Sequence, residues 1–585
     1  MSEHHDAGAH TVAELLAARE HDDGPGLHFD DTTWSWRHVV TESRRRADLA
    51  SARRAPGPFH IGVLLDNVPE YLLWLGAAAL AGATVVGINP TRRGEELTRD
   101  IRFTDCQILV TDQSGAALLD ALDLEVPDER FLRIDGADYR ARLDASASDS
   151  AASDSAASAS GAASSWAVSP DDLLLLLFTS GTTGNPKAVR CTQGRLAAIA
   201  GRASEIYGFE RHDICYCPMP LFHGNAIMAL WAPALAVGAS VAVAGRFSAS
   251  RFLADVRQFR ATRFTYVGKA LAYVLATPES DDDIDNTLRQ GFGTEASGPD
   301  RAIFERRFAC RLVEGYGSSE GGTSINVTPD TPPGSLGVPP PTDDVAVIDP
   351  GTGRECDRAR FDDGGGLVNA GDAIGEIVNR TGGRGFEGYY KNPDGNAERV
   401  RDDWYWSGDL GYRDEAGFFY FAGRGGDWLR VDSENFAAAP IERVVERYPD
   451  IAAAAVYPVP DPRTGDQVMT TVELRPGVAF DPVSFAQFLR SQPDLGAKWP
   501  PRFVRVSPGL PLTATGKITK ASLRAEAWHC ADPVFWSPGR GELHYRLLTN
   551  EDRDTLRVEF EDHGRSHLLG VAVGTRSRRA GPDVL

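Results

Sequence analysis

The sequence predicts an α/β protein in which a large N-terminal domain with doubly wound sheets precedes a small, mobile α+β C-terminal domain. Strand patterns alternate with helix patterns from residue 60 onward, which is typical of a parallel sheet covered on both faces. The apolar run Leu173–Phe178 has the length and composition of a strand that is buried on both faces. At 585 residues, the chain is also too long for a single hydrophobic core.

Composition limits the partners and the compartment. The net charge of −21 argues against binding to nucleic acid and against electrostatic attraction to anionic lipid. The seven cysteines form no CxxC pair and no zinc spacing, so we expect free thiols in a reducing cytoplasm. The N-terminus lacks the basic segment and apolar core of a signal peptide. We therefore predict a cytoplasmic protein.

Two apolar stretches, residues 71–88 and 226–245, are candidates for a membrane span. Glycines interrupt both stretches, whereas a spanning helix needs about 20 uninterrupted apolar residues. Each stretch is better explained as a buried helix followed by a strand. We predict no transmembrane segment, and peripheral attachment to a membrane stays open.

The N-terminal elements follow in order. Thr11 and Glu14 form a capping box that begins a helix, residues 27–36 resemble a hairpin, and Ser35 caps a second helix. Strands are expected at residues 61–65, 84–88 and 107–111, with helices after Pro69 and from Glu95. Residues 145–165 contain only Ala, Ser, Asp and Gly, so we expect a solvated, mobile insertion there.

A glycine cluster marks the predicted domain boundary. Residues 1–422 form the large domain, 423–426 the hinge and 427–545 the small domain. The small domain is expected to contain a helix near residues 441–448, strands at 452–458 and 468–474, and a helix from Pro482. Residues 546–585 are charged and weakly periodic, and we expect a disordered tail.

The loop Thr179–Lys187 that follows the buried strand can bind phosphate. Its backbone N–H groups and hydroxyls can face phosphate oxygens, with Lys187 as a point charge. It is not a Walker A loop, because Pro186 and Ala188 flank the lysine. A flexible Ser/Gly turn is the alternative. The candidate phosphate-binding residues are Thr179, Ser180, Gly181, Thr182, Thr183, Gly184 and Lys187.

This nonamer, TSGTTGNPK, resembles the phosphate loop of the acyl-adenylate-forming superfamily, which includes AMP-dependent acyl-CoA synthetases, luciferases and peptide-synthetase adenylation domains. The resemblance extends from about residue 11 to residue 548, without the insertion. Four segments are similar to the fatty acid transport protein and very-long-chain acyl-CoA synthetase branch. They are residues 245–256, 266–275, 424–436 and 532–536.

A second motif, EGYGSSEGG at Glu314–Gly322, resembles the aromatic-Gly-x-Thr-Glu motif of that superfamily. The resemblance implies that Tyr316, with Gly317, packs on adenine, that Ser319 binds the α-phosphate and that Glu320 holds Mg²⁺. Mg²⁺ prefers hard oxygen ligands, usually one or two carboxylates plus phosphate.

Asp409, in a turn after an aromatic strand, can accept both ribose hydroxyls. It resembles the ribose-binding carboxylate of the superfamily, and Arg424 resembles its partner. The alternative is a turn aspartate and a surface arginine without a role in binding.

Lys517, in PLTATGKITK, resembles the adenylation lysine, whose charge offsets the repulsion between a carboxylate and the α-phosphate. Lys520 is its competitor, but it lacks the preceding Thr-Gly turn and is expected to be a solvated helix residue. His223, in PLFHG, corresponds to a segment beside the acyl pocket. A core histidine bonded to a backbone carbonyl is the alternative.

The resemblance implies an ATP- and Mg²⁺-dependent fatty-acyl-CoA ligase that activates a long-chain, very-long-chain or sterol side-chain acid through acyl-AMP and transfers it to CoA. Two rivals stay open: transfer to the phosphopantetheine of a carrier protein, and non-catalytic lipid binding on the same fold. A homodimer also stays open. Two departures concern the small domain: Gly426 stands at the hinge, and Ser433 replaces a glycine in the loop that approaches CoA.

Overall fold

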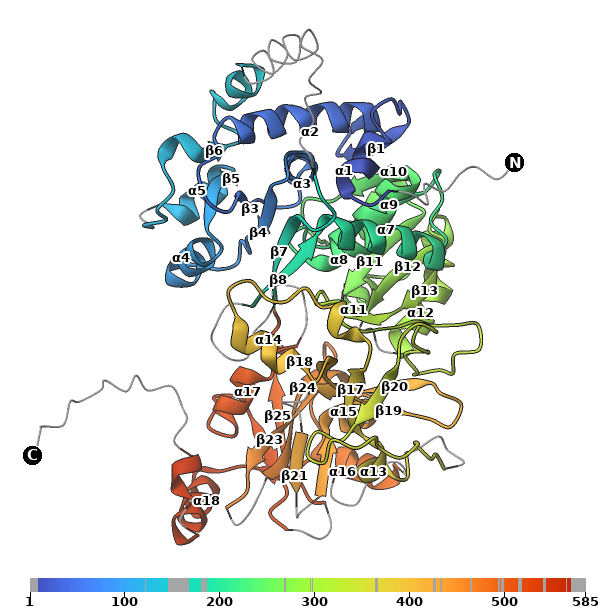
Figure 1. The fold of residues 1–585 in the computed structure, drawn as a ribbon. Coiled ribbons are helices and arrows are strands. Elements are labelled where there is room, and N and C mark those ends of the chain that lie inside the picture. The colour runs from blue at the N-terminus through green and yellow to red at the C-terminus, as the bar shows by residue number, and fades with distance from the viewer. Residues whose placement is uncertain are drawn as a thin grey trace, which may run out of the picture. The chain divides into compact units, whose positions relative to one another are not determined.

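The computed structural model describes residues 9–120, 122–145, 168–179, 187–267, 270–294, 296, 298–362, 367–424, 428–431, 434–462, 466–492, 495, 499–513, 518–539, 543–563 and 565–569. The chain divides into two compact units (Figure 1). Unit 1 contains the described parts of Met1–Val327 and Gly382–Asp403. Unit 2 contains those of Thr328–Thr381, Trp404–Thr513 and Ile518–Leu585.

Unit 1 contains a six-stranded sheet in the order β6-β5-β3-β4-β7-β8. Its neighbours pair in parallel except for β7 and β8, which are antiparallel. The strands are β3 His60–Leu64, β4 Thr84–Gly87, β5 Cys106–Thr111, β6 Phe131–Arg133, β7 Leu173–Thr179 and β8 Lys187–Thr192. The buried leucines of β7 therefore lie in a largely parallel sheet, as predicted.

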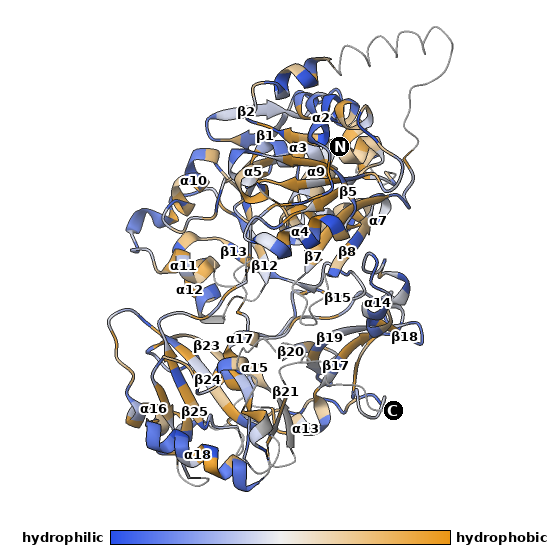
Figure 2. Ribbon diagram, turned by 90° about the vertical axis from the view of Figure 1, so that its left-hand side faces the viewer, coloured by the Kyte–Doolittle hydropathy of each residue, from blue (hydrophilic) through white to orange (hydrophobic). Residues whose placement is uncertain are grey.

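A second, seven-stranded sheet of unit 1 has the order β13-β12-β11-β9-β10-β1-β2. All its pairs are parallel except the β1–β2 hairpin, which was predicted at residues 27–36. The strands are β1 Pro25–Phe29, β2 Thr32–Ser35, β9 Ile214–Cys217, β10 Ser240–Val243, β11 Arg263–Val267, β12 Gln290–Thr294 and β13 Arg311–Glu314. Figure 2 shows the strands of this unit mostly in hydrophobic colours.

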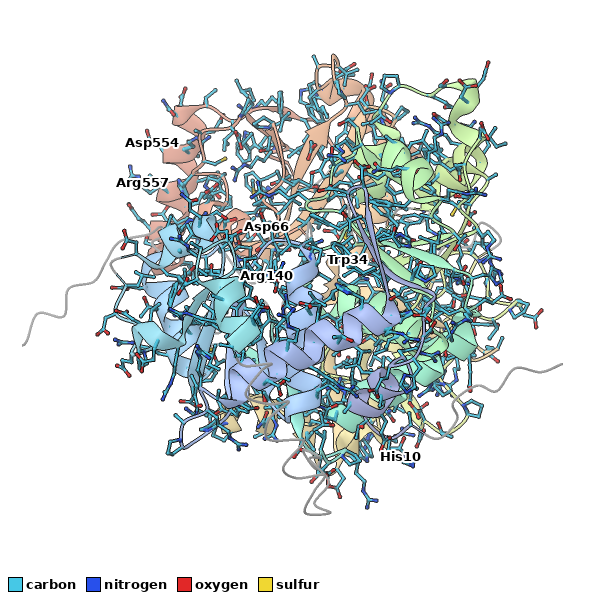
Figure 3. All side chains as sticks on the ribbon, turned by 90° about the horizontal axis from the view of Figure 1, so that it is seen from above. His10, Trp34, Asp66, Arg140, Asp554 and Arg557 are labelled. Carbon is cyan, nitrogen blue, oxygen red and sulfur yellow. The ribbon has the colours of Figure 1, made fainter. Side chains whose placement is uncertain are left out.

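Helices cover both sheets of unit 1. The longer ones are α2 Trp36–Ser51, α3 Pro69–Ala81, α4 Gly94–Phe103, α7 Gln193–Tyr207, α10 Phe252–Phe259 and α12 Gly298–Phe308. The shorter ones are α1 Val12–Ala17, α5 Gln113–Leu119, η1 Asp128–Arg130, α8 Gly224–Ala226, the π turn η2 Ile227–Trp231, α9 Ala232–Val237, α11 Ala270–Leu275 and η3 Asp281–Ile284. α2 packs on the buried helix α3. Figure 3 shows the molecule from above, the side on which α2 lies in Figure 1.

Local sequence signals account for several boundaries of these elements. The capping box of Thr11 and Glu14 begins α1, and the Ser35 hydroxyl accepts a hydrogen bond from the N–H of His38 at the start of α2. Both apolar stretches form a helix and then a strand: α3 ends at Gly82 before β4, and α9 ends at Gly238 before β10. Both glycines are left-handed, a conformation that favours glycine. Among the described residues, no helix is long and apolar enough to cross a membrane.

Residues Gly382–Asp403 return to unit 1 and add small elements to it. They are η4 Gly382–Arg384, α14 Pro393–Arg399 and β18 Val400–Arg401. The pair β14 Tyr316–Gly317 and β15 Ser324–Ile325 also belongs to unit 1.

Unit 2 contains an antiparallel sheet, a hairpin and a mixed sheet. The antiparallel sheet contains β16 Val345–Ile348, β17 Gly375–Asn379, β19 Trp404–Arg413 and β20 Phe419–Arg424. The hairpin joins β21 Trp428–Val431 to β22 Glu434–Ala437. The mixed sheet, in the order β23-β24-β25-β26-β27, contains β23 Ile451–Pro460, β24 Asp466–Leu474, β25 Phe503–Ser507, β26 Val534–Trp536 and β27 Arg546–Leu547. The helices are α13 Ala370–Ala373, α15 Ala438–Val445, α16 Pro482–Ser491, α17 Ala521–Glu526, α18 Asn550–Asp562 and η6 Ser566–Leu568.

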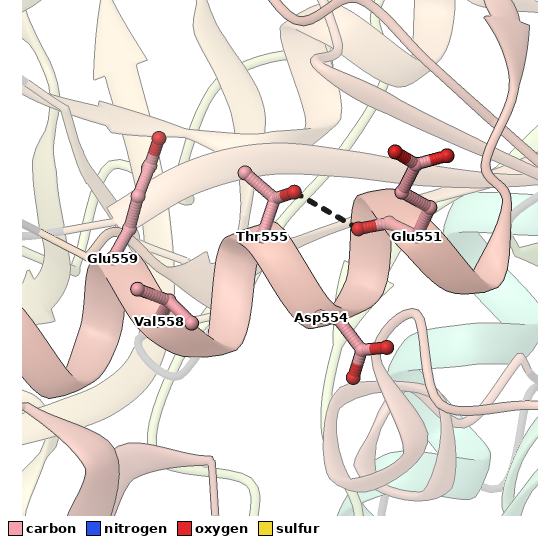
Figure 4. A pocket seen from close by; sticks show the side chains of 5 residues that line it. All are labelled: Glu551, Asp554, Thr555, Val558 and Glu559. Carbon is pink, nitrogen blue, oxygen red and sulfur yellow. Dashed lines mark hydrogen bonds between the residues drawn. The ribbon is translucent and has the colours of Figure 1, made fainter.

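The expectation of a disordered tail from residue 546 is wrong for residues 546–562. They form β27 and α18, and a capping box between Thr549 and Asp552 begins α18. Leu556 and Phe560 are buried in a core that also contains Trp528. The outer face of α18 carries acidic side chains around Val558 (Figure 4). Charged residues on this face mask the apolar spacing in the sequence.

The α/β fold class with its additional C-terminal α+β part is confirmed. Residues 146–167 of the predicted insertion, Gly425 and Gly426 of the hinge, Ser433 and residues 570–585 lie outside the described residues. The boundary at the glycine cluster stays a prediction.

Candidate active site

The phosphate-loop candidate is framed by the ends of β7 and β8. Thr179 lies opposite Lys187 in the antiparallel pair, and its hydroxyl donates a 3.4 Å hydrogen bond to the Lys187 carbonyl oxygen. Ser180, Gly181, Thr182, Thr183 and Gly184 lie outside the described residues. The structure thus fixes both ends of the loop.

Lys187 places its charge inside unit 1. The residue is 9% exposed, and its Nζ lies 3.4 Å from Oε2 of Glu398. The same nitrogen lies 5.5 Å from the ring centroid of Tyr389, within the range of a cation–π contact. The cation is therefore held by a carboxylate and an aromatic face.

Glu320 lies in a tight turn that follows β14. The turn is closed by a hydrogen bond from the N–H of Gly321 to the carbonyl oxygen of Ser318, and Gly321 has a φ of +77°. The Glu320 side chain is buried, and its Oε1 accepts a 3.0 Å hydrogen bond from the Tyr389 hydroxyl. Tyr389 therefore contacts both Glu320 and Lys187.

Arg195 on α7 supports the turn from the other side. Its Nη2 donates a hydrogen bond to the carbonyl oxygen of Ser319, and its side chain is only 10% exposed. A Cβ at Gly321 would lie 2.2 Å from that nitrogen and would displace the guanidinium, and the φ of +77° also favours glycine. The Ser319–Gly321 turn is thus fixed to the helix that follows β8.

The His223 segment approaches the same turn. A Cβ at Gly224 would lie 2.7 Å from the hydroxyl oxygen of Ser319 and 3.6 Å from Leu177 of β7. His223 itself is half-buried, and its ring lies 5.1 Å from that of Phe222. The structure therefore brings the predicted acyl-pocket segment to the predicted α-phosphate ligand.

Tyr316 and Gly317 form β14 immediately before the turn. Tyr316 lies opposite Ile325 and Gly317 lies opposite Ser324 in the short antiparallel pair. The Tyr316 side chain is half-buried. This arrangement places both adenine candidates within three residues of Ser319.

Asp409 and Arg424 lie in unit 2. They are directly opposite each other in the β19–β20 pair. Gly408 has a φ of +73°, and its N–H donates a 2.7 Å hydrogen bond to Glu376, while the N–H of Asp409 donates to the Ser407 hydroxyl. The register places the two predicted ribose ligands side by side in the backbone.

Lys517 lies outside the described residues, but its competitor Lys520 does not. Lys520 Nζ lies 2.8 Å from Oε1 of Glu442, and its side chain is 13% exposed. The expectation that Lys520 is a solvated helix residue is therefore wrong. It precedes α17 and forms an ion pair that connects this region to α15.

Glu320 fits a metal that is held by substrate and protein together. Among the described residues, no group of three or more His, Cys, Asp or Glu side chains could hold a metal ion alone. Mg²⁺ commonly binds through one or two carboxylates plus substrate phosphates, and a single buried carboxylate in a phosphate site suits that arrangement.

No sequence pattern marks Arg195, Tyr389 or Glu398 as residues of the site. Tyr389 and Glu398 belong to GYYKNPDGNAER at residues 388–399, whose Asn-Pro signal marks a helix start but not a contact with Glu320. Arg195 lies three residues after the Thr192 cap of α7. None of the three positions carries a pattern that points to the site.

Comparison with known proteins identifies the family. The model of the AMP-binding enzyme family matches residues 16–390, and that of the AMP-binding enzyme C-terminal domain matches residues 440–517. A steroid-22-oyl-CoA synthetase from Rhodococcus jostii is 54% identical, over 96% of this chain and 99% of the relative. The medium/long-chain-fatty-acid–CoA ligase FadD17 from Mycobacterium tuberculosis is 45% identical, over 90% of this chain and 98% of its own.

Solved structures show the same fold at lower identity. The anthranilate CoA ligase AuaEII with anthranoyl-AMP has a TM-score of 0.76 at 19% identity, covering 88% of this chain and 97% of that one. ATP-bound MatB from Rhodopseudomonas palustris has a TM-score of 0.73 at 24% identity, covering 88% and 98%. Since the family model spans most of the chain and the relatives align along nearly their whole length, this chain belongs to the AMP-binding enzyme family.

Proposed function

We propose that this chain is an ATP-dependent acyl-CoA ligase that joins a lipid carboxylic acid to CoA through an acyl-AMP intermediate. The observation that carries the proposal is the arrangement around Ser319 and Glu320. The carboxylate and the His223 segment meet at one turn, and Tyr389 connects that carboxylate to Lys187 at the end of the phosphate loop. Close relatives with CoA-ligase names support the same reaction class.

The first half-reaction forms acyl-AMP. A carboxylate oxygen of the acid attacks the α-phosphorus of ATP, and the bond to the β-phosphate oxygen breaks to release pyrophosphate. Lys187 and the loop residues 179–184 hold the β- and γ-phosphates, and the Ser319 hydroxyl donates to the α-phosphate. Glu320 would hold Mg²⁺, which when bound would offset the negative charge of the phosphates. Asp409 with Arg424 binds the ribose, and Tyr316 with Gly317 contacts the adenine.

Lys517 belongs to the same half-reaction. Its ammonium bridges the attacking carboxylate and the α-phosphate, where negative charge builds in the transition state. His223 lies beside the bound carboxylate. In the second half-reaction the CoA thiolate attacks the acyl carbon and AMP leaves.

We propose a sterol side-chain acid as the preferred substrate, with a medium- or long-chain fatty acid as the second candidate. The steroid-22-oyl-CoA synthetase shares 54% of residues with this chain, whereas the fatty-acid–CoA ligase FadD17 shares 45%. We place the reaction in the cytoplasm, where ATP and CoA are both supplied. A homodimer remains an open proposal.

Two rival functions make different demands on the chain. Transfer to a carrier protein would use the same adenylation site but would not use free CoA. A non-catalytic lipid-binding protein would need neither the buried Lys187 nor the buried Glu320, because neither a cation nor a carboxylate is required to bind an apolar chain.

The decisive experiment is ATP–pyrophosphate exchange across a panel of carboxylic acids, followed by thioester detection with CoA. The panel contains a steroid with a 22-carboxylate and straight-chain acids of medium and long length. We expect exchange and thioester with the steroid acid at the highest kcat/KM. Exchange without thioester would favour the carrier-protein rival, and no exchange with any acid would favour lipid binding.

A further inference from the structure

One tyrosine, Tyr389, links the two charged groups of the candidate site. It lies in the segment that returns to unit 1 before α14, and it is 2% exposed. Its hydroxyl donates to Oε1 of Glu320 at 3.0 Å, and its ring faces Lys187 Nζ at 5.5 Å. None of the motifs that predict adenylation contains this residue.

A directed chain of hydrogen bonds runs through the hydroxyl. Nε of Arg399 donates to the Tyr389 oxygen at 3.1 Å, and the Tyr389 hydroxyl donates to Glu320. The Tyr389 hydroxyl is the donor in this pair, because a carboxylate oxygen only accepts and the ordinary tyrosine pKa of about 10 keeps the phenolic proton in place at neutral pH. A guanidinium donor strengthens the hydroxyl as a donor, because hydrogen bonds in a chain polarise one another.

The backbone of this segment is held rigidly. The N–H of Tyr389 donates a 2.6 Å hydrogen bond to the side chain of Asn396 in α14, and the N–H of Tyr390 donates to the carbonyl oxygen of Ala188 in β8. The carbonyl oxygen of Gly388 accepts from Arg190, also in β8. Tyr389 is therefore fixed against the strand that begins with Lys187.

The helix α14 contributes the side chains that contact Lys187 and the Tyr389 hydroxyl. Asn392 caps the helix through the N–H of Gly395, and the last two helical residues are Glu398 and Arg399. Glu398 pairs with Lys187, and Arg399 donates to Tyr389. One short helix thus contacts the cation directly and the Glu320 carboxylate through Tyr389.

We propose that Tyr389 is a positioning residue for metal-bound ATP. Its hydroxyl fixes the orientation of the Glu320 carboxylate for the metal, and its ring keeps the Lys187 ammonium at the end of the phosphate loop. Partners that orient a metal ligand commonly contribute 10–100-fold to metal affinity. The inference rests on the proposed role of Glu320, so its test must separate the two.

The test measures metal affinity without turnover. Mn²⁺ is titrated by electron paramagnetic resonance into the full-length enzyme with α,β-methylene-ATP, which cannot release pyrophosphate. Tyr389→Phe keeps the ring and removes the hydroxyl, and we expect the Kd for Mn²⁺ to rise about 10-fold. In pyrophosphate exchange, high Mg²⁺ should restore most of the activity of this variant.

Tyr390→Phe is the matched control. Its hydroxyl donates to the carboxylate of Asp105 at 2.5 Å, so the variant also loses one hydrogen bond to a carboxylate from the adjacent residue. We expect its Kd for Mn²⁺ to stay within two-fold of the wild type. Arg399→Met is a second variant, which removes the guanidinium that donates to Tyr389. It should also raise the Kd for Mn²⁺, so the proposal can still be tested if Tyr389→Phe does not fold.

The outcomes separate the two levels of the argument. A wild-type Kd in Tyr389→Phe, or an equal rise in Tyr389→Phe and Tyr390→Phe, overturns the positioning role. Glu320→Gln, titrated in parallel, tests the proposed metal ligand. If Glu320→Gln also binds Mn²⁺ like the wild type, the proposed role of Glu320 as a metal ligand fails. If the Kd for Mn²⁺ rises in Glu320→Gln but not in Tyr389→Phe, only the positioning role of Tyr389 is overturned.

Discussion

At the scale of single residues, burial concentrates positive charge in an acidic chain. The net charge is −21, yet two cations near the candidate site, Lys187 and Arg195, have side chains that are each 10% exposed. Arg195 binds the Ser319 carbonyl oxygen, and Lys187 pairs with Glu398. In a partly desolvated site each charge acts more strongly on a phosphate than it would in water.

Two lysines close together in sequence allow a controlled test of the adenylation lysine. Lys517→Ala should abolish acyl-AMP formation, because its charge is needed where two anions meet. Conversion of supplied acyl-AMP and CoA to thioester should stay largely intact. Lys520→Ala is the control: it breaks the ion pair with Glu442 and should leave pyrophosphate exchange within a few-fold of the wild type. Equal loss of both half-reactions in Lys517→Ala would refute the assignment.

Asp100 on α4 gives a prediction for the pH dependence of stability. Burial raises its pKa to about 6, although Arg92 opposes the shift. In the unfolded chain the pKa is about 3.9, so folding stability falls as pH rises from about 4 to 6, by up to roughly 3 kcal/mol. Asp100→Asn removes this loss, and its melting temperature relative to the wild type should increase over that interval.

Asp105 provides a control of opposite sign. Its pKa is lowered: burial acts in the other direction, but the contacts with Lys391 and Tyr390 outweigh it. A lowered carboxyl pKa contributes stability that is present above the unfolded pKa of about 3.9 and is lost as pH falls below it. Asp105→Asn should therefore be more destabilising relative to the wild type above about pH 4 than in more acidic solution. Parallel pH profiles for Asp100→Asn and Asp105→Asn would contradict at least one of the two assignments, and the sign of the shared slope would show which one.

At the scale of elements, the helix and strand boundaries that depend only on neighbouring residues were predicted from the sequence. The capping box of α1, the glycine ends of α3 and α9, and the strand β7 all follow from patterns within a few residues. The contacts of the site could not be predicted in this way. Glu320 and Tyr389 are 69 residues apart, and Lys187 and Glu398 are 211 apart. Only the pairing of the returning segment with β8 brings these partners together.

The helix α18 lies in a segment that was expected to be a disordered tail. Most of its residues are charged, but Leu556 and Phe560 are four residues apart, so they share one face of the helix and lie in one core. Phe560 is fully buried, and its ring lies 6.2 Å from that of Trp528. A two-residue stripe is too weak a periodicity to outweigh the surrounding charges.

Phe560→Ala tests whether α18 belongs to the folded C-terminal part. We expect a loss of about 3–5 kcal/mol, because a buried phenyl ring is removed and a cavity remains. Val558 lies on the outer side of the same helix and is 45% exposed, so Val558→Ala should change the free energy of unfolding by less than about 0.5 kcal/mol. The measurement is differential scanning calorimetry of both variants. Equal melting temperatures would show that α18 contributes nothing to the core.

At the scale of the whole molecule, one enzyme has to perform two half-reactions with different nucleophiles. The predicted site residues fall in both units: Lys187, Ser319 and Glu320 in unit 1, and Asp409 with Arg424 in unit 2. The resemblance implies that the small domain rotates about the hinge between adenylation and thioester formation. Lys187 and Glu320, which we propose to bind the phosphates and their metal, both lie in unit 1 with Tyr389, so rotation need not disturb their contacts.

The hinge itself gives the last prediction. Gly426 follows Gly425, and glycine adopts positive φ at little steric cost, so the small domain should rotate without a side chain that locks either orientation. Gly426→Pro fixes φ near −65° and should trap the orientation that tolerates this angle. We expect adenylation to survive and thioester formation to fail, because Lys517 must contact the phosphates when ATP is bound. Pyrophosphate exchange and thioester formation from supplied acyl-AMP are measured on the same preparation, so each reaction controls for the folding of the other. Wild-type rates for both would show that Gly426 is not the pivot.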